Sequence, residues 1–279
     1  MKVCISVFVI IALLFTACST NNVTVGDSMK QYFDSAGVRG DFGLLDNGQG
    51  HFTIYNLARF RDSAFVPGET FDIVLSLLAI QTGVAKDEHT YVIGNEPRLA
   101  DVVADDPRWG APRMTLAQAF RASADSDILG FRDLARMLGR DTVKKWIDSL
   151  RYGNKDIGGF KDSFWLTGSL KINSDEQLGL IKKLYFGQLP FYRRSQEAVR
   201  SMMLTESNSN YKLVYKTGGV KPPGGPAIGW VMGWVEENKH PYFFVLNLES
   251  DRADADLAGT GLELVKKLLR PMGFFEGKK

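Results

Sequence analysis

Two acidic residues and one lysine in this chain have the types and spacing that chemistry at a protein site uses. Glu69 and Asp72 are three residues apart. Asp72 lies near the start of residues 71–80, which are apolar on nearly every face. Residues three apart on a helix are neighbours. Two neighbouring carboxylates repel, which raises the pKa of one of them, and such pairs serve in general acid and base catalysis. Lys216, in the sequence Lys-Thr-Gly-Gly, brings a cation that would act on the same site.

The acid pair also has a structural interpretation. Carboxylates at a helix N-terminus are stabilised by the exposed N–H groups and by the helix macrodipole. Lys216 would then pair with one of them, so that a salt bridge fills the site. No metal centre and no cofactor are expected, because no residues have metal-ligand spacing and the three histidines, His51, His89 and His240, are isolated.

The elements that would position these residues follow from local patterns. Alternating apolar residues around Asn47-Gly48 predict a β-hairpin within residues 41–55. Residues 71–80 predict a buried helix, because a helix that is apolar all round lies inside a domain. Asn173, followed by acidic residues, predicts the N-cap of a helix that runs through Leu184.

The remaining pattern defines the fold class. Helices are predicted over residues 115–122, 128–138, 140–150 and 262–269, and strands over residues 211–217, 227–236 and 242–248. Strands at both ends with helices in the middle predict an α+β fold. We expect an αβα sandwich, with an antiparallel sheet flanked by helices and with an inserted helical subdomain.

The N-terminus is typical of a secreted protein. Residues 1–17 read as a signal peptide, with Lys2 before an apolar stretch over residues 3–15. Phe-Thr-Ala-Cys, ending at Cys18, resembles a bacterial lipobox; the alternative is an ordinary signal peptide that happens to end before a cysteine. Cys4 lies inside the signal peptide, so the mature chain would hold no disulfide.

Diacylation of Cys18 would hold the protein at a membrane, because two acyl chains anchor where a single one does not. Residues 18–32 are then expected to form a lipidated N-terminus and tether, and residues 33–279 the domain. Ser19 and Thr20 carry no acidic retention signal, which favours the outer membrane, facing the periplasm, as the location in the bacterial cell envelope.

Composition excludes one class of partner. The chain has 34 basic and 32 acidic residues and a formal net charge of +2. A balance this close argues against nucleic acid as the main partner. Hydrophobic residues make up 44% of the chain and aromatic residues 11%, which is ordinary for a globular protein with a core.

Five motifs in the same order and spacing make the chain similar to class D (oxacillinase-type) β-lactamases and to their transpeptidase-like, penicillin-binding relatives. The motifs lie at residues 65–84, 152–157, 164–166, 216–218 and 229–236. The resemblance covers nearly the whole mature chain. In that family, a serine that opens the buried helix attacks the β-lactam carbonyl, and a lysine one turn later takes the proton of the serine. The matching positions here are Glu69 and Asp72.

The resemblance implies roles for further residues. Ser126 matches a serine that relays a proton to the leaving nitrogen; Ser123 is a weaker match, and a helix N-cap is the structural alternative. Lys216, Thr217 and Gly218 would line the site from a strand, with Gly218 small enough for the backbone of a ligand to lie alongside. The oxyanion hole would be formed by the backbone N–H groups of Glu69 and Gly219. Trp165 would either donate a hydrogen bond to Asp72 or simply pack in the core.

The departures from the family set the functional expectation. The serine, the lysine and an arginine that anchors the carboxylate of the drug are all absent; Ser209 and Lys212 have the right spacing but lead into a strand, and Arg252 is out of register. We therefore expect a pseudoenzyme that cannot form an acyl-enzyme and that binds β-lactams or peptidoglycan stem peptides.

Two alternatives remain open. One is a residual or altered hydrolase in which Asp72 acts as the base, and the other is an interaction module of the envelope. A salt bridge from Glu69 to Lys216 would block the site, whereas a displaced Glu69 would leave the oxyanion hole reachable.

Overall fold

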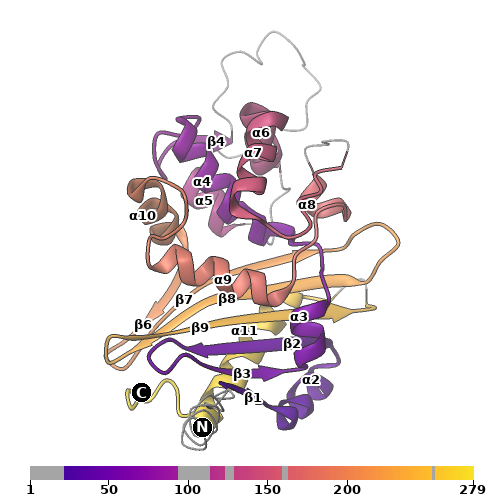
Figure 1. The fold of residues 1–279 in the computed structure, drawn as a ribbon, viewed down its shortest axis with the longest axis vertical. Coiled ribbons are helices and arrows are strands. Elements are labelled where there is room, and N and C mark those ends of the chain that lie inside the picture. The colour runs from indigo at the N-terminus through magenta and orange to yellow at the C-terminus, as the bar shows by residue number, and fades with distance from the viewer. Residues whose placement is uncertain (1–21, 94–113, 123–128, 159–162, 253–254) are drawn as a thin grey trace, which may run out of the picture.

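A seven-stranded sheet runs through the middle of the molecule, and helices cover both of its faces (Figure 1). The computed structural model describes residues 22–93, 114–122, 129–158, 163–252 and 255–279. The order across the sheet is β1-β3-β2-β9-β8-β7-β6. The strands are β1 (Val23–Val25), β2 (Arg39–Asp46), β3 (His51–Tyr55), β6 (Leu204–Ser207), β7 (Lys212–Val220), β8 (Ala227–Glu237) and β9 (His240–Ser250).

Most neighbouring strands pair as the sequence predicted. β2 and β3 form an antiparallel hairpin in which Asp46 lies opposite His51, so the turn covers residues 47–50 and includes Asn47-Gly48. β7, β8 and β9 form a second antiparallel set. One expectation was wrong, because β1 pairs with β3 in parallel, and the sheet is therefore mixed.

The parallel strand also changes the N-terminal boundary. Val23 and Val25 lie opposite Phe52 and Ile54, and the buried Met29 follows in the short helix η1 (Asp27–Met29). These residues fall in the segment that the sequence assigned to a tether ending at residue 32. Residues 23–25 form a strand that pairs with β3. The polar composition of the segment gave no indication of this strand.

One face of the sheet is covered by two helices, α2 (Lys30–Ala36) and α11 (Leu257–Leu269), which contact each other. Their apolar side chains form one core cluster with the strands, including Phe33, Leu264 and Val265. Helix α11 begins at Leu257 and not at residue 262 as predicted. The side chain of Asp256 accepts a hydrogen bond from the N–H group of Gly259 at 2.8 Å and so caps the earlier start.

The other face carries helix α9 (Ser174–Tyr185), and beyond it the inserted helical lobe. The other elements are α3 (Leu57–Asp62), η2 (Gly68–Phe71), α4 (Asp72–Thr82), β4 (Tyr91–Ile93), β5 (Met114–Thr115), α5 (Leu116–Arg121), α6 (Leu129–Leu138), α7 (Arg140–Leu150), α8 (Phe164–Thr167), α10 (Arg193–Met202) and η3 (Arg270–Met272). This is the predicted αβα arrangement with a helical insertion.

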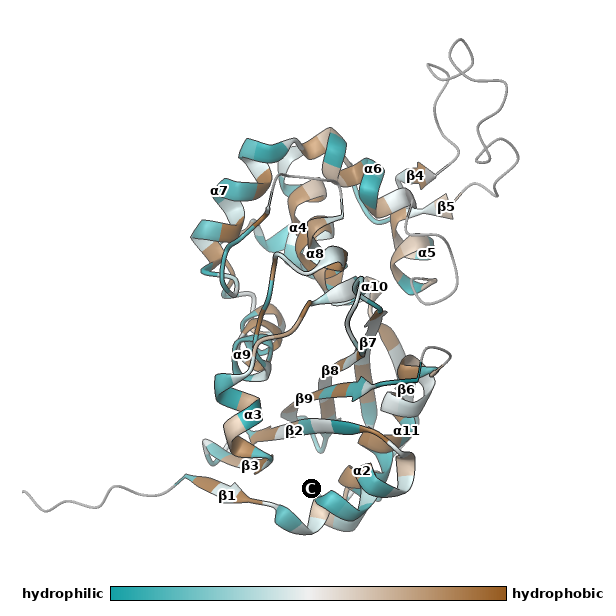
Figure 2. Ribbon diagram, turned by 90° about the vertical axis from the view of Figure 1, so that its right-hand side faces the viewer, coloured by the Kyte–Doolittle hydropathy of each residue, from teal (hydrophilic) through white to brown (hydrophobic). Residues whose placement is uncertain are grey.

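Helix α4 lies at the centre of the second, larger core cluster. Nine of its residues in succession are buried, from Asp72 to Ile80. Figure 2 shows hydrophobic residues along α4 and the central strands, in contrast to the largely hydrophilic outer helix α7. The prediction of a buried central helix is confirmed. Within the described part of the chain, no helix is long and apolar enough to cross a membrane.

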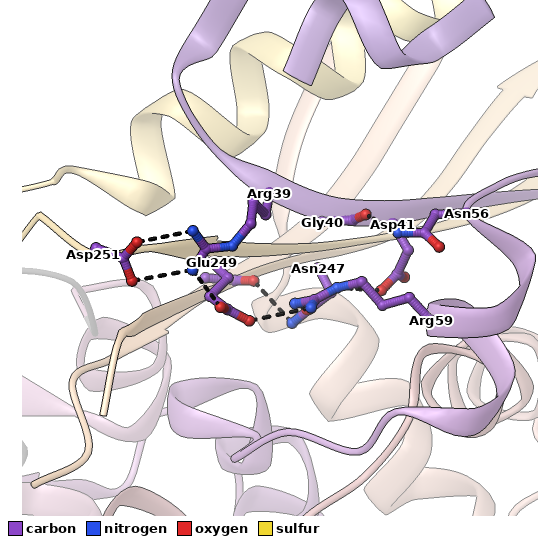
Figure 3. Close-up of polar contacts among 9 residues, drawn as sticks. Arg39, Gly40, Asp41, Asn56, Arg59, Asn247, Glu249 and Asp251 are labelled. Atoms are coloured by element: carbon purple, nitrogen blue, oxygen red, sulfur yellow. Dashed lines mark hydrogen bonds and ion pairs between the residues drawn. The ribbon is translucent and has the colours of Figure 1, made fainter. Parts of the chain in front are cut away.

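A charged network fastens α3 to the sheet (Figure 3). The guanidinium group of Arg59 lies 3.3 Å from the Asp41 carboxylate, 3.1 Å from Glu249 and 2.8 Å from the Asn247 side-chain oxygen. Asp41 is fully buried, and this burial raises the pKa of its carboxyl to about 7 although Arg59 acts in the opposite direction. On the outside of the network, Arg39 pairs with Glu249 at 2.6 Å. Strands β2 and β9 are thus tied to α3, which leads toward the segment before α4.

The N-cap of α9 provides a test of the fold. Asn173 accepts a hydrogen bond from the N–H group of Glu176 at 2.8 Å and donates one to the carbonyl of Arg61 at 3.0 Å. We expect Asn173→Ala to lower the free energy of unfolding by about 1–2 kcal/mol, because the cap and the link to α3 are both lost. Urea denaturation measures this value.

Asn210 serves as the control for this substitution. It is exposed, and its side chain contacts only the neighbouring Ser209 by a hydrogen bond. Asn210→Ala should change the free energy of unfolding by less than about 0.5 kcal/mol. Equal losses in the two variants would show that the cap of α9 contributes nothing specific.

Candidate functional site

The two acidic residues lie where the chain enters helix α4. Gly68 has a φ of 55°, in the left-handed region, and starts the 3-10 turn η2 that continues into α4. Glu69 lies in η2 and is 8% exposed, and Asp72 is the first residue of α4 and is 1% exposed. Both carboxyl groups are therefore inside the protein, where an ionised group must find a partner.

The segment before η2 is held in place by backbone contacts. Phe65 forms an isolated antiparallel bridge with Ile172, with two hydrogen bonds of 2.9 Å. The indole N–H of Trp230, on β8, donates to the carbonyl of Val66 at 2.9 Å, and both groups are buried. The guanidinium group of Arg59 lies 4.0 Å from the ring centre of Phe65. The entry to the acid pair is thus fixed from the sheet and from α3.

Strand β7 packs backbone against backbone on η2. A Cβ atom on Gly218 would lie 2.7 Å from the backbone nitrogen of Thr70, and one on Gly68 would lie 3.1 Å from the carbonyl oxygen of Gly219. Only glycine permits this approach. The sequence prediction reserved the space at Gly218 for a ligand, but in the structure the chain's own residue Thr70 lies there.

The carboxylate of Glu69 turns toward β7. The backbone N–H of Gly219 donates a short hydrogen bond to its Oε2 atom. Burial raises the pKa of the Glu69 carboxyl, while the N–H groups of Gly219 and of Glu69 itself and the charge of Lys216 oppose that rise. The two backbone donors that the resemblance assigned to an oxyanion hole thus both act on this one carboxylate.

Lys216 pairs with the second acid. Its Nζ atom lies 3.6 Å from Oδ2 of Asp72, with each side chain only 2% exposed. The ring centre of Phe120 lies 4.8 Å from the same Nζ atom. Burial raises the pKa of the Asp72 carboxyl and lowers the pKa of the Lys216 amine, and the attraction between the two opposes both shifts. The predicted salt bridge therefore forms with Asp72, while Glu69 occupies the backbone donors.

The other predicted residues divide between the site and its surroundings. Trp165 is fully buried, and its ring packs 5.7 Å from that of Phe71, centre to centre. Its indole nitrogen has no hydrogen-bond partner among the described residues, so the expected bond to Asp72 is absent and the core interpretation holds. Thr217 is half-buried on β7, beside Lys216. Ser126 and Cys18 lie outside the described residues.

Sequence reasoning missed two side chains that shape the site. Gln177, on α9, donates to Oγ1 of Thr70 at 3.0 Å, and that hydroxyl in turn donates to the carbonyl of Pro67 at 2.6 Å. Trp230, described above, is the other. Neither has a local signal, because each contacts a partner more than a hundred residues away. Within the described ranges, no group of acidic, histidine or cysteine side chains could hold a metal ion.

Two adjacent glycines test the close packing of β7. We expect Gly218→Ala to lower the free energy of unfolding by about 1–3 kcal/mol, because the new methyl group would overlap the backbone of Thr70. At Gly219 the nearest atom to an added Cβ lies 3.8 Å away, so Gly219→Ala should change the value by less than about 0.5 kcal/mol. Denaturant titration of both variants measures the difference. Equal tolerance at the two positions would contradict the described contact.

The chain can now be compared with known proteins. Residues 28–270 match the family model for the penicillin-binding protein transpeptidase domain. The chain is 36% identical to β-lactamase OXA-48 of Klebsiella pneumoniae, over 81% of this chain and 80% of that relative.

Solved structures agree with these matches. The class D β-lactamase FUS-1 (OXA-85) of Fusobacterium nucleatum superposes with a TM-score of 0.79 at 28% identity, over 91% of this chain and 100% of that structure. The C-terminal domain of the BlaR penicillin-receptor of Bacillus licheniformis superposes with a TM-score of 0.78 at 25% identity, over 93% of this chain and 100% of that domain. The chain therefore belongs to the penicillin-binding protein transpeptidase domain family, within the group that contains the class D β-lactamases.

Proposed function

We propose that this protein is a lipid-anchored envelope member of its family that does not form an acyl-enzyme and that binds its ligands without covalent chemistry. The observation that carries the proposal is the carboxylate of Glu69 on the N–H group of Gly219. Ligands of the proposed binding function are β-lactams or peptidoglycan stem peptides.

Acylation needs a nucleophile, a base and donors for the developing oxyanion. The resemblance aligns Glu69 with the nucleophilic serine and Asp72 with the basic lysine. A carboxylate that attacked an amide would give an unstable anhydride, so Glu69 is a poor acyl acceptor. A ligand carbonyl would also have to displace a charged acceptor from the N–H of Gly219, and hydrogen bonds to charged groups are the stronger ones.

The hydrolase alternative would use Asp72 as a base that activates water. Its raised pKa favours that role, since a stronger base takes a proton more readily. However, Asp72 is 1% exposed and is engaged by Lys216, so its carboxylate offers little surface to a water molecule. If Asp72 acts as a base, we expect the wild type to hydrolyse a substrate and Asp72→Asn to lose this activity.

One structure with the same fold supports a receptor-like role. The BlaR domain that superposes on this chain is described as a penicillin-receptor. That description supports ligand binding as a function of the fold. The third possibility, an interaction module of the envelope, differs in where the partner binds, because a partner bound away from the site would not respond to Glu69→Ala.

The absence of acylation is directly testable. We expect incubation with a fluorescent penicillin, followed by a denaturing gel and mass spectrometry, to show no adduct on this protein, because Glu69 supplies no stable acyl acceptor. An active class D β-lactamase treated in the same way provides the positive control. A stoichiometric adduct would overturn the proposal.

Glu69→Ala distinguishes two effects of Glu69, which are the occupation of the backbone donor at Gly219 and the absence of a nucleophile. The variant still lacks the nucleophile, so it should form no adduct. Its backbone N–H at Gly219 is released, and we expect non-covalent penicillin binding to become about 10-fold tighter, or about 1.4 kcal/mol. Calorimetric titration of both proteins measures this. Unchanged affinity would show that Glu69 does not compete with ligands.

Membrane attachment has its own test. We expect labelled palmitate to be incorporated into the full chain and the protein to fractionate with the outer membrane. Cys18→Ser should abolish both, because the thiol carries the acyl group, while Cys4→Ser should retain both. Label in Cys18→Ser would disprove lipidation at this cysteine.

A further inference from the structure

Lys216 and Asp72 meet inside the protein as a complete pair of reactants. An amine and a carboxyl group lie 3.6 Å apart, nitrogen to oxygen, where strand β7 packs against the turn η2 that leads into α4. Reacting groups fixed at such a separation reach effective concentrations on the order of 10⁵–10⁸ M. The two residues come from strand β7 and from the first turn of α4, so neither has to move far to meet the other.

Among the described residues, the pair is surrounded by buried side chains. Lys216 and Asp72 are each 1% exposed. The ring centre of Phe120 lies 4.8 Å from the Nζ atom of Lys216. Phe71, which precedes Asp72 in the chain, and Trp165, which packs against Phe71, are both fully buried. A site closed in this way supplies little water for the hydrolysis of a bond that forms inside it.

A second carboxylate stands beside the pair. Glu69 is close enough to influence the charges of both Lys216 and Asp72. Its position is fixed by the hydrogen bond from the N–H of Gly219. Its negative charge therefore acts on both groups from a fixed place.

We propose that Lys216 and Asp72 condense into an amide, an intramolecular isopeptide bond that joins strand β7 to helix α4. The Nζ atom of Lys216 attacks the Cγ atom of Asp72, and a carbon–nitrogen bond forms. One carbon–oxygen bond of the carboxyl group then breaks. A proton passes from the nitrogen to the departing oxygen, so that one molecule of water leaves. No oxidant, cofactor or second substrate is required.

The electrostatics of the site favour the reactive forms of both groups. The amine must be unprotonated to attack, and burial lowers the pKa of Lys216. The carboxyl group must be protonated so that its oxygen can leave as water, and burial raises the pKa of Asp72. Where the pair is ionised, the amide has the further advantage of carrying no charge, because the desolvation of a buried ion costs several kcal/mol.

Tryptic peptides of the full chain test the proposal. Trypsin cleaves after lysine unless its amine is acylated. We expect the peptide of residues 62–86, which contains Asp72, to be joined to the peptide of residues 213–239, with no cleavage after Lys216 and a total mass smaller by one water molecule. If the wild-type protein yields instead the separate peptides 213–216 and 217–239, the proposal is wrong.

Three variants identify the atoms. Lys216→Arg and Asp72→Leu should abolish the joined species, whereas a loss of water that persists in either variant would place the reaction elsewhere and overturn the assignment. The hydrogen bond of Glu69 lies with Gly219, so Glu69→Gln, which keeps the size and the acceptor, should still form the joined species and serves as the control. Circular dichroism verifies that each variant is folded.

This inference and the proposed function fail independently. A penicillin adduct would remove the pseudoenzyme proposal but would leave the joined peptides to be explained. Unlinked tryptic peptides would remove the isopeptide bond but would leave Glu69 on its backbone donors and the absence of acylation unaffected.

Discussion

The contact between strand β7 and the turn that opens α4 determines the rest of the structure. Three ionisable groups, from Glu69, Asp72 and Lys216, are buried at this contact. An ion inside a protein costs several kcal/mol unless it is paired, and removing one partner of a buried pair is strongly destabilising. The glycines at positions 68 and 218 allow the two backbones to approach closely enough for the groups to meet.

The surrounding elements hold this contact from several directions. Trp230 fastens the segment before η2 to the sheet, and Gln177 reaches from α9 to Thr70 on the other side. The network around Arg59 fixes α3, which precedes that segment in the chain. The fold of the family is therefore retained, while Glu69 accepts from Gly219 and Asp72 pairs with Lys216. A site whose charged groups are engaged with each other has less to gain from a substrate than one whose donors face an open cleft.

The sequence predicted what depends on local signals. Asn47-Gly48 marked the first hairpin, and Asn173 marked the start of α9, since turns and caps are set by residues close together in the chain. The Lys-Thr-Gly strand and the buried helix were also correct, and so was the pairing of Lys216 with one acid. The choice between Glu69 and Asp72 was out of reach, because it depends on the position of the Gly219 backbone. The parallel pairing of β1 likewise rests on a contact between distant residues. The start of α11 at Leu257 does have a local signal, the cap at Asp256, which the prediction missed.

The short strand β1 at the edge of the sheet has a consequence for the geometry of an anchored protein. If Cys18 carries lipid, residues 19–21 separate it from Asn22, where the described part of the chain begins. The four Cα–Cα steps from Cys18 to Asn22 extend over at most about 14 Å. The edge of the sheet at β1 would then lie close to the lipid headgroups. The helical lobe, at the opposite end of the molecule in Figure 1, would point away from the bilayer. A protein anchored in this way could bind only ligands in a thin layer immediately next to its membrane.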